Sequence, residues 1–165
     1  MPNIKSPEFD DVREHEGFNC RRARLGLQAG AVRVGASLWE LPPGQAAYPY
    51  HYHLVEEELL IMLEGSMQLR TPDGWRTFEE GEVIAFPVGE AGAHQVVNTG
   101  DTTVKFLAIS PSGMPEIVVQ ADASKLGAFE RRADGGGIRE WYRRADAAPY
   151  FEDVPPPEPP RLNDP

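Results

Sequence analysis

The fold of this chain is decided by residues 51–65, which read HYHLVEEELLIMLEG. His51 and His53 stand two positions apart, the spacing at which side chains share one face of a β-strand. An acidic triplet and an apolar run follow, and the run ends at Gly65. Two imidazoles on one face with carboxylates close behind them predict a metal-binding site on a β structure.

The sequence around this stretch has the punctuation of an all-β fold. From Val32 to Ser110, short apolar runs rich in β-branched and aromatic residues alternate with turns that contain Gly and Pro. Residues 71–74, Thr-Pro-Asp-Gly, suit a tight hairpin turn. The pattern predicts about eight strands in about 80 residues and requires no long helix.

A second group of glycine, proline and histidine residues lies downstream. Three of the four histidines, His51, His53 and His94, fall inside the predicted β region rather than in the terminal segments. The downstream group consists of Gly81, Pro87, Gly89, His94 and Asn98.

The two groups together resemble the paired motifs of the cupin superfamily. Gly44, His51-x-His53, Glu58 and Gly65 follow the order of the first motif, and the downstream group follows the second. Two loops depart from the usual spacing, because the segment after Gly44 is one residue longer and residues 90–93 add two more. Such length changes in loops cost little free energy. The resemblance covers about residues 32–110 and implies a small single-domain (monocupin) metal-binding protein. The implied fold is a double-stranded β-helix, a jelly-roll barrel of two packed antiparallel sheets.

The resemblance also implies a ligand set for one divalent metal ion, which would be Fe, Mn, Ni, Zn or Co. Glu57 is an alternative to Glu58, because unbroken two-residue alternation from His53 would select Glu57, whereas the spacing to Gly65 selects Glu58. Three imidazoles and one carboxylate suit borderline divalent ions and leave coordination positions open for a substrate. The expected ligands are His51, His53, Glu58 and His94.

Other side chains near these motifs are candidates for contacts with a substrate. Tyr50, next to His51, is the candidate catalytic residue, because its hydroxyl could donate to a bound anion or accept a proton. Glu56 and Glu57 are the other acid or base candidates, or one of them could orient a metal-bound imidazole. The candidate pocket residues are Tyr48, Trp39, Met62, Gln68 and Phe86.

Composition narrows the class of partner. With 16 Lys and Arg against 26 Asp and Glu, the formal net charge is −10, which disfavours nucleic acids and anionic membrane surfaces. No export signal or apolar span long enough for a membrane is visible. The single cysteine, Cys20, cannot form an intrachain disulfide, which fits a reducing cytoplasm.

The chain outside the barrel divides into extensions. We expect an N-terminal extension at 1–31, a barrel core at 32–112, a C-terminal extension at 113–153 that packs on the barrel or on a partner subunit, and a proline-rich tail at 154–165. Residues 134–137 predict a flexible break, and residues 138–146 a short amphipathic helix. Trp141, Tyr142, Tyr150 and Phe151 in an otherwise polar extension favour a homodimer, because exposed aromatic rings tend to cover a surface.

Three kinds of function are compatible with this sequence. The first is a metal-dependent enzyme acting on a small oxygen-rich substrate, either an oxygenase or an isomerase, lyase or decarboxylase. The second is a cupin that binds a small molecule without catalysis. The third is a structural metal site, which the mixed ligand set disfavours because structural zinc sites usually close every position, often with thiolates. The sequence favours an enzyme.

Overall fold

The structure is a computed structural model, and it describes residues 1–112, 115–130 and 137–157 of the 165-residue chain. It is built almost entirely of β-strands. The N-terminal segment forms β1 (Asp11–Arg13), β2 (Cys20–Ala23) and a single helical turn, α1 (Leu25–Gln28). Among the described residues, no helix is long and apolar enough to cross a membrane.

The predicted barrel region contains eight strands, as expected from the sequence. They are β3 (Val34–Leu41), β4 (His51–His53), β5 (Glu58–Glu64), β6 (Ser66–Thr71), β7 (Gly74–Glu79), β8 (Val83–Phe86), β9 (Gln95–Val97) and β10 (Val104–Pro111). A short 3-10 turn, η1 (Glu90–Gly92), precedes β9. The predicted hairpin is present, since Thr71 of β6 pairs with Gly74 of β7 across Pro72 and Asp73.

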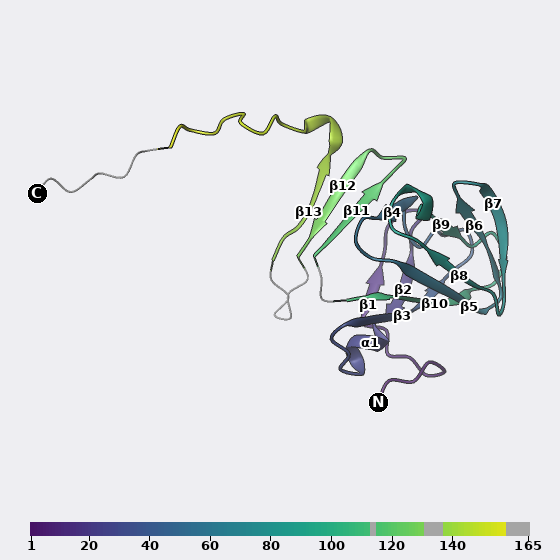
Figure 1. Cartoon of the computed structure of the whole chain (residues 1–165). Coiled ribbons are helices and arrows are strands. Elements are labelled where there is room, and N and C mark those ends of the chain that lie inside the picture. The colour runs from purple at the N-terminus through teal and green to yellow at the C-terminus, as the bar shows by residue number, and fades with distance from the viewer. Residues whose placement is uncertain (113–114, 131–136, 158–165) are drawn as a thin grey trace, which may run out of the picture.

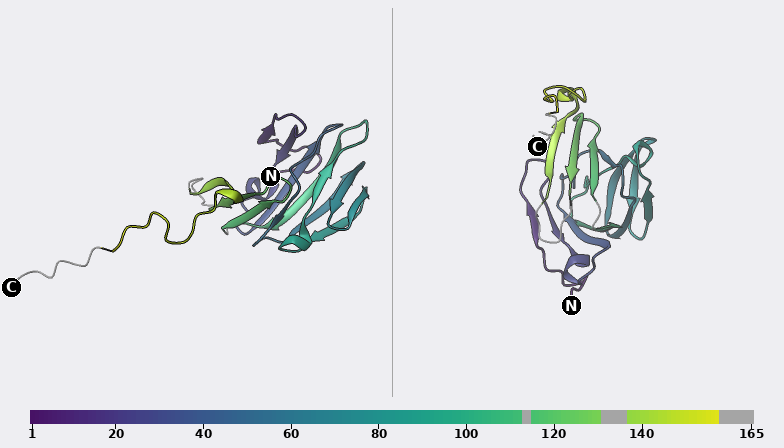
Figure 2. Two further views of the ribbon diagram at one scale, coloured as in Figure 1. Left: turned by 90° about the horizontal axis from the view of Figure 1, so that it is seen from above. Right: turned by 60° about the vertical axis from the view of Figure 1, so that its left-hand side comes forward.

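The strands form two facing layers (Figures 1 and 2). One layer is a six-stranded sheet in the order β1-β2-β3-β10-β5-β8. The other layer combines two sheets. The first is four-stranded, in the order β13 (Arg139–Arg143), β12 (Lys125–Phe129), β11 (Glu116–Gln120) and β4, and the second is three-stranded, in the order β7-β6-β9. The bridge between His51 and His94 links these two sheets, because β9 begins at the residue after His94. This all-β, two-layer architecture confirms the predicted fold class.

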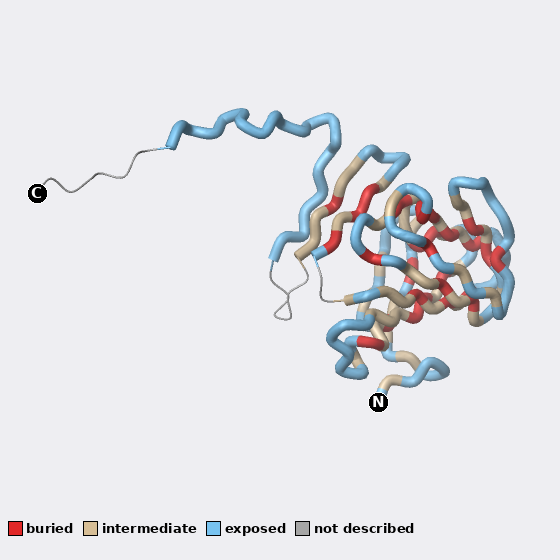
Figure 3. The backbone as a smooth tube through the Cα atoms, in the orientation of Figure 1, coloured by how far each residue is buried: buried red, intermediate tan, exposed pale blue. Residues whose placement is uncertain are grey.

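The core lies between the layers, and Figure 3 shows buried segments along the facing strands. Alternate residues point inward, as Met67 and Leu69 do on β6 while Gln68 between them is only partly covered. Each fully buried apolar side chain contributes roughly 1.5–3 kcal/mol to stability. Members from both layers include Trp39, Leu41, Leu60, Met62, Met67, Leu69, Phe78, Val96 and Phe106.

Gly65 connects β5 to β6 in a conformation that other residues rarely adopt. Its φ is 84°, and a Cβ atom at this position would lie 3.0 Å from Val104 Cγ1. A side chain here would be strained and crowded at once. The glycine that ends the deciding stretch is therefore a requirement of the turn.

Both extensions add strands to the two layers. β1 and β2 continue the sheet beyond β3, and β11 (Glu116–Gln120), β12 (Lys125–Phe129) and β13 (Arg139–Arg143) continue the sheet beyond β4. A 3-10 turn, η2 (Arg144–Asp146), follows, and the chain then leads away from the strands (Figure 1).

The prediction of a short helix at residues 138–146 was wrong. Its central residues form β13, because each of them pairs with a residue of β12, from Arg139 opposite Phe129 to Arg143 opposite Lys125. Tertiary pairing overrides a short helical pattern that contains β-formers such as Trp141 and Tyr142. Of the predicted flexible break, residues 134–136 lie outside the described residues, as do residues 158–165 of the tail.

Candidate metal centre

The strand β4 presents His51 and His53 to the interior between the layers. It is held by antiparallel pairing with β11, where His51 lies opposite Gln120 and His53 opposite Val118. His51 also exchanges two backbone hydrogen bonds with His94, at 3.1 and 2.8 Å. Strand alternation and this bridge bring all three imidazoles to one place.

Glu58 reaches the same place from the opposite layer. The chain leaves β4 after His53 and enters β5 at Glu58, so the two-residue alternation does not continue across residues 54–57. The carboxylate oxygen Oε2 of Glu58 lies 2.9 Å from His94 Nε2 and 3.8 Å from His53 Nε2. Glu57 is exposed to solvent, so its side chain lies away from this group.

The imidazoles are oriented by contacts on their outer nitrogens. His51 Nδ1 lies 3.0 Å from the carbonyl oxygen of Pro49, and His94 Nδ1 lies 2.9 Å from that of Gly92. A carbonyl oxygen only accepts, so Nδ1 carries the proton and the Nε2 lone pair of each ring points inward.

These inward lone pairs face one another and a carboxylate. The Nε2 atoms of His51 and His53 are 3.1 Å apart, and ligand atoms of His51, His53 and Glu58 all lie within 4.8 Å of one another. The lone pair of His94 faces Glu58 at 2.9 Å. Electron-rich atoms gathered in this way need a proton or a cation between them, so the residues fit a divalent metal ion.

Burial and charge give two of these residues, His51 and Glu58, the protonation states that a metal requires. Burial lowers the pKa of His51 to about 3, and the neighbouring His94 and His53 add to this effect. Burial alone would raise the pKa of Glu58, but contact with His94 and the other two histidines outweighs it and lowers the pKa to about 2. At neutral pH, the imidazole of His51 is therefore uncharged and the carboxylate of Glu58 is ionised, so both have a lone pair available for a metal ion.

Gly92 has a specific part in this geometry. An added Cβ atom at Gly92 would lie 1.8 Å from the carbonyl oxygen of Pro87, so only glycine fits. Its own carbonyl holds His94 Nδ1. The longer loop before His94 therefore contains a residue whose carbonyl oxygen orients this imidazole.

Three predicted pocket residues adjoin the histidines. The ring of Phe86 stacks on His94 with 3.8 Å between centroids, and the ring of Tyr48 lies edge-on to His51 at 4.6 Å. Trp39 in turn meets Tyr48 at 6.0 Å. The buried Tyr48 hydroxyl has no hydrogen-bond partner among the described residues, and burial, followed by the charge of Glu58, raises its pKa well above 10.0.

The three other predicted residues have different surroundings. Met62 is 1% exposed and belongs to the apolar core. Gln68 donates to Thr77 Oγ1 on the neighbouring strand, on the face opposite to the buried Met67 and Leu69. Tyr50 packs against Arg70, whose Cζ atom lies 3.9 Å from the ring centroid.

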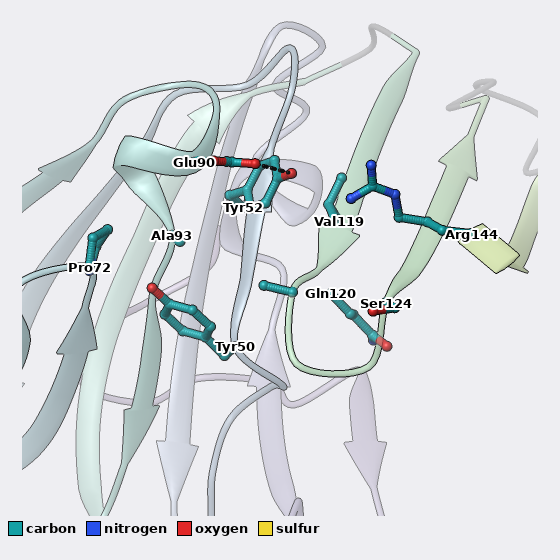
Figure 4. A pocket seen from close by; sticks show the side chains of 10 residues that line it. Tyr50, Tyr52, Pro72, Glu90, Ala93, Val119, Gln120, Ser124 and Arg144 are labelled. Atoms are coloured by element: carbon teal, nitrogen blue, oxygen red, sulfur yellow. Dashed lines mark hydrogen bonds between the residues drawn. The ribbon is translucent and has the colours of Figure 1, made fainter.

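Tyr50 lines a separate cavity of about 360 Å³ (Figure 4). Tyr52, whose hydroxyl lies 3.5 Å from Glu90, also lines it, together with Val119 and Arg144. Because Tyr52 alternates with His51 and His53, this cavity lies on the other face of β4. The candidate catalytic tyrosine therefore neighbours the histidines in sequence but not in the site.

Two buried carboxylates lie near His53. Glu116 and Glu56 are 1% and 2% exposed, and Glu116 Oε1 lies 3.7 Å from His53 Nδ1. Burial opposes protonation of His53, yet Glu116 and Glu58 raise its pKa overall. Glu56 was a candidate from the sequence, but Glu116 was not, because it is a carboxylate at the start of an apolar run outside both motifs.

Comparison with known proteins places these features in a wider context. The sequence profile of the cupin domain family matches residues 37–110. A glucose-6-phosphate isomerase of Pyrococcus abyssi is 41% identical over 69 residues, an alignment that covers 38% of this chain and 35% of that protein. The match therefore spans about a third of the curated relative.

Solved structures share the fold over most of the chain. A putative sugar phosphate isomerase from Acidithiobacillus ferrooxidans superposes with a TM-score of 0.77 at 24% identity, covering 88% of this chain and 90% of that one. A cupin-superfamily sugar phosphate isomerase from Silicibacter pomeroyi gives 0.76 at 23% identity, covering 92% and 98%. These two likenesses establish the fold, including the strands outside residues 37–110.

Proposed function

Since residues 37–110 are a cupin domain of this protein, we propose that the chain is a metal-dependent enzyme that interconverts aldose and ketose forms of a small sugar phosphate. One divalent ion, Fe, Mn, Ni, Zn or Co, serves the reaction. Its proposed ligands are His51, His53, Glu58 and His94.

One observation supports the proposed metal site most directly: lone pairs of the histidine rings point inward to the carboxylate of Glu58. The Nδ1 atoms of His51 and His94 are engaged by backbone carbonyls, so their Nε2 atoms are available in the interior. Glu58, with its lowered pKa, supplies the negative charge. Lone pairs and a carboxylate charge without a partner are costly to bury, and one divalent cation would bind all of them.

The site's own residues suit an isomerisation through an enediol. A bound divalent ion supplies Lewis acidity for adjacent substrate oxygens. The Tyr48 hydroxyl remains protonated because its pKa is raised, so it donates a hydrogen bond to a substrate oxygen. The rings of Phe86 and Tyr48 flank His94 and exclude water from the reacting atoms.

The proposed substrate class follows from one of the similar proteins. The glucose-6-phosphate isomerase of Pyrococcus abyssi shares 41% of residues over the aligned region. A phosphate group on this acidic protein needs a local cation, and Arg22 is our candidate. Arg22 lies opposite Trp39 in the β2 and β3 pairing, with its Cζ atom 5.0 Å from the Trp39 ring. Asp11 pairs with it on one side.

The proposal is tested on purified protein loaded in turn with each of the five metals. We expect metal-dependent interconversion of glucose 6-phosphate and its ketose isomer, with deuterium from heavy water entering at the carbon that receives a proton, which is C1 when the aldose is converted to the ketose. The Trp75→Phe variant on the exposed β7 strand is a control that should retain this activity.

Three results would redirect the proposal. Oxygen uptake by the iron-loaded protein would indicate an oxygenase instead. Saturable sugar-phosphate binding without exchange or turnover would indicate a binding protein, the alternative function. Absence of any bound metal would remove the proposed centre altogether.

The C-terminal extension, residues 113–153, is our proposed interface with a second copy of the chain. All five residues of β13 are exposed, including Trp141 and Tyr142, and β13 has a strand partner on one edge only among the described residues. Tyr150 and Phe151 are exposed beyond it. An edge strand with exposed aromatic rings favours pairing with another chain.

Sedimentation equilibrium at micromolar concentration tests this interface. We expect twice the 18.3 kDa chain mass for the wild type and a monomer for Trp141→Glu. Trp75→Glu, at a tryptophan on β7 that is 55% exposed against 45% for Trp141, should remain dimeric. A monomeric wild-type protein would contradict the proposal.

A further inference from the structure

A carboxylate lies directly behind His53, on the side away from the proposed metal ion. Nε2 of His53 faces His51 and Glu58, at 3.1 and 3.8 Å. Its other ring nitrogen, Nδ1, faces Glu116 Oε1 at 3.7 Å. The imidazole thus stands between the metal-ligand group and a second acidic residue.

Glu116 is held firmly in this position. Its side chain is completely buried, and Oε1 accepts hydrogen bonds from the backbone N–H groups of Leu54 and Val55, at 3.2 and 3.4 Å. These two residues directly follow His53. The carboxylate therefore fixes both the end of β4 and the space beside the imidazole.

The burial of this charge calls for an explanation. Within the part of the chain that the structure describes, no Lys or Arg nitrogen lies within 4.0 Å of Glu116, and His53 is its ion-pair partner. An ionised carboxylate without a partner is expensive to bury. Two backbone N–H groups and the imidazole are what this site offers it.

The three histidines differ in what faces Nδ1. His51 and His94 have backbone carbonyls at 3.0 and 2.9 Å, whereas His53 has a carboxylate. A carboxylate that accepts the N–H of a metal-bound imidazole fixes its tautomer and increases its basicity as a ligand. His53 would then be the strongest nitrogen donor of the three.

We propose that Glu116 is a positioning residue of the metal centre: it accepts the Nδ1–H of His53 and so aims the Nε2 lone pair at the metal. This inference rests on the proposed metal site. The separation of 3.7 Å is longer than a hydrogen bond, and we expect it to shorten when Nε2 binds the ion.

The consequence concerns the C-terminal extension. Glu116 opens β11 and lies beyond residues 37–110, the region that matches the cupin domain family. The strand added after the matched domain pairs with β4 and brings this carboxylate to His53. The extension thus contributes to the metal centre as well as to the sheet.

Titration of the metal-free, full-length protein with Co²⁺ tests the proposal through its visible absorption. Glu116→Gln keeps the shape of the side chain and removes its charge. We expect it to weaken Co²⁺ binding by about 10- to 100-fold and to shift the absorption bands. Glu57→Gln, on the exposed neighbour of Glu58, should stay within about twofold of the wild type.

A further variant separates general charge from this particular contact. Glu56 offers an oxygen within 4.8 Å of ligand atoms of both His53 and Glu116. If any nearby negative charge sufficed, Glu56→Gln would change affinity and spectrum as much as Glu116→Gln does, and the proposal would be overturned. We expect a smaller change for Glu56→Gln.

The tautomer gives a measurement that does not depend on a variant folding. Nitrogen-15 NMR of the wild-type protein should show His53 protonated at Nδ1, and an Nε2-protonated ring would contradict the proposal. Wild-type Co²⁺ affinity and spectrum in Glu116→Gln would overturn this inference alone. Failure of the wild type itself to bind Co²⁺ would overturn the metal site with it.

Discussion

The two faces of strand β4 show how differently neighbouring residues are used. On the inner face, His51 and His53 meet Glu58 and His94 between the layers. On the outer face, Tyr52 packs with Tyr50, Ala93 and Val119 beside a separate cavity. Position relative to the sheet, rather than proximity in sequence, decides which side chains share a site.

The polar contacts on the two faces also differ in strength. The inner group is largely withdrawn from water, with side chains of His94 and Glu58 at 0% and 15% exposure. The outer pair of Arg70 and Asp122 is bidentate but exposed, at 30% and 58%. Exposed ion pairs contribute little to stability, because water screens them. Buried polar groups interact more strongly, because the interior has a low dielectric constant.

The largest expected effect is on the inner face, at Glu58. Replacing Glu58 with Gln removes the negative charge that faces three histidines, so metal affinity should fall by more than about 100-fold, beyond the usual effect of outer-shell changes. Calorimetric titration with Zn²⁺ measures this. A larger loss of affinity in Glu57→Gln than in Glu58→Gln would show that the wrong glutamate has been assigned.

An intermediate effect is expected where the two tyrosines are compared. Tyr48→Phe removes the hydroxyl beside the proposed metal site. It should lower kcat for the proposed sugar-phosphate isomerisation by about 10-fold, the value of one hydrogen bond near charge. Tyr50→Phe should leave kcat within about twofold. The reverse order would return the catalytic role to Tyr50, the residue that the sequence favours.

The smallest effect should come from the outer ion pair. Asp122→Asn breaks the contact with Arg70, and the free energy of unfolding should change by less than about 1 kcal/mol. Urea unfolding measures this change, and metal affinity should stay constant. A large loss of metal binding in this variant would mean that the two faces are coupled through β4.

The comparison also shows what could be predicted from the sequence. The eight strands from β3 to β10 and the turn at Pro72 and Asp73 follow from local signals: β-branched runs, prolines and glycines that act over a few residues. The resemblance to the cupin superfamily was recognised from the spacing of two motifs. The match of residues 37–110 to the cupin domain family confirms it.

Other features depend on long-range pairing and were beyond these local signals. Residues 139–143 became a strand because β12 lies beside them, not because of their own pattern. Tyr50 and Gln68 do not face the interior between the layers. Which residues face inward depends on the pairing of their strands with distant ones, and local signals do not determine that pairing. Glu116 reaches His53 only through the pairing of β11 with β4.

The most direct test of the account is the metal content of the protein with His51 and His94 both replaced by Ala, beside the wild type. After loading with excess metal and desalting, we predict one equivalent in the wild type and none in the double variant, with near-native circular dichroism in both. One equivalent retained by the folded double variant would contradict the assignment of the metal centre.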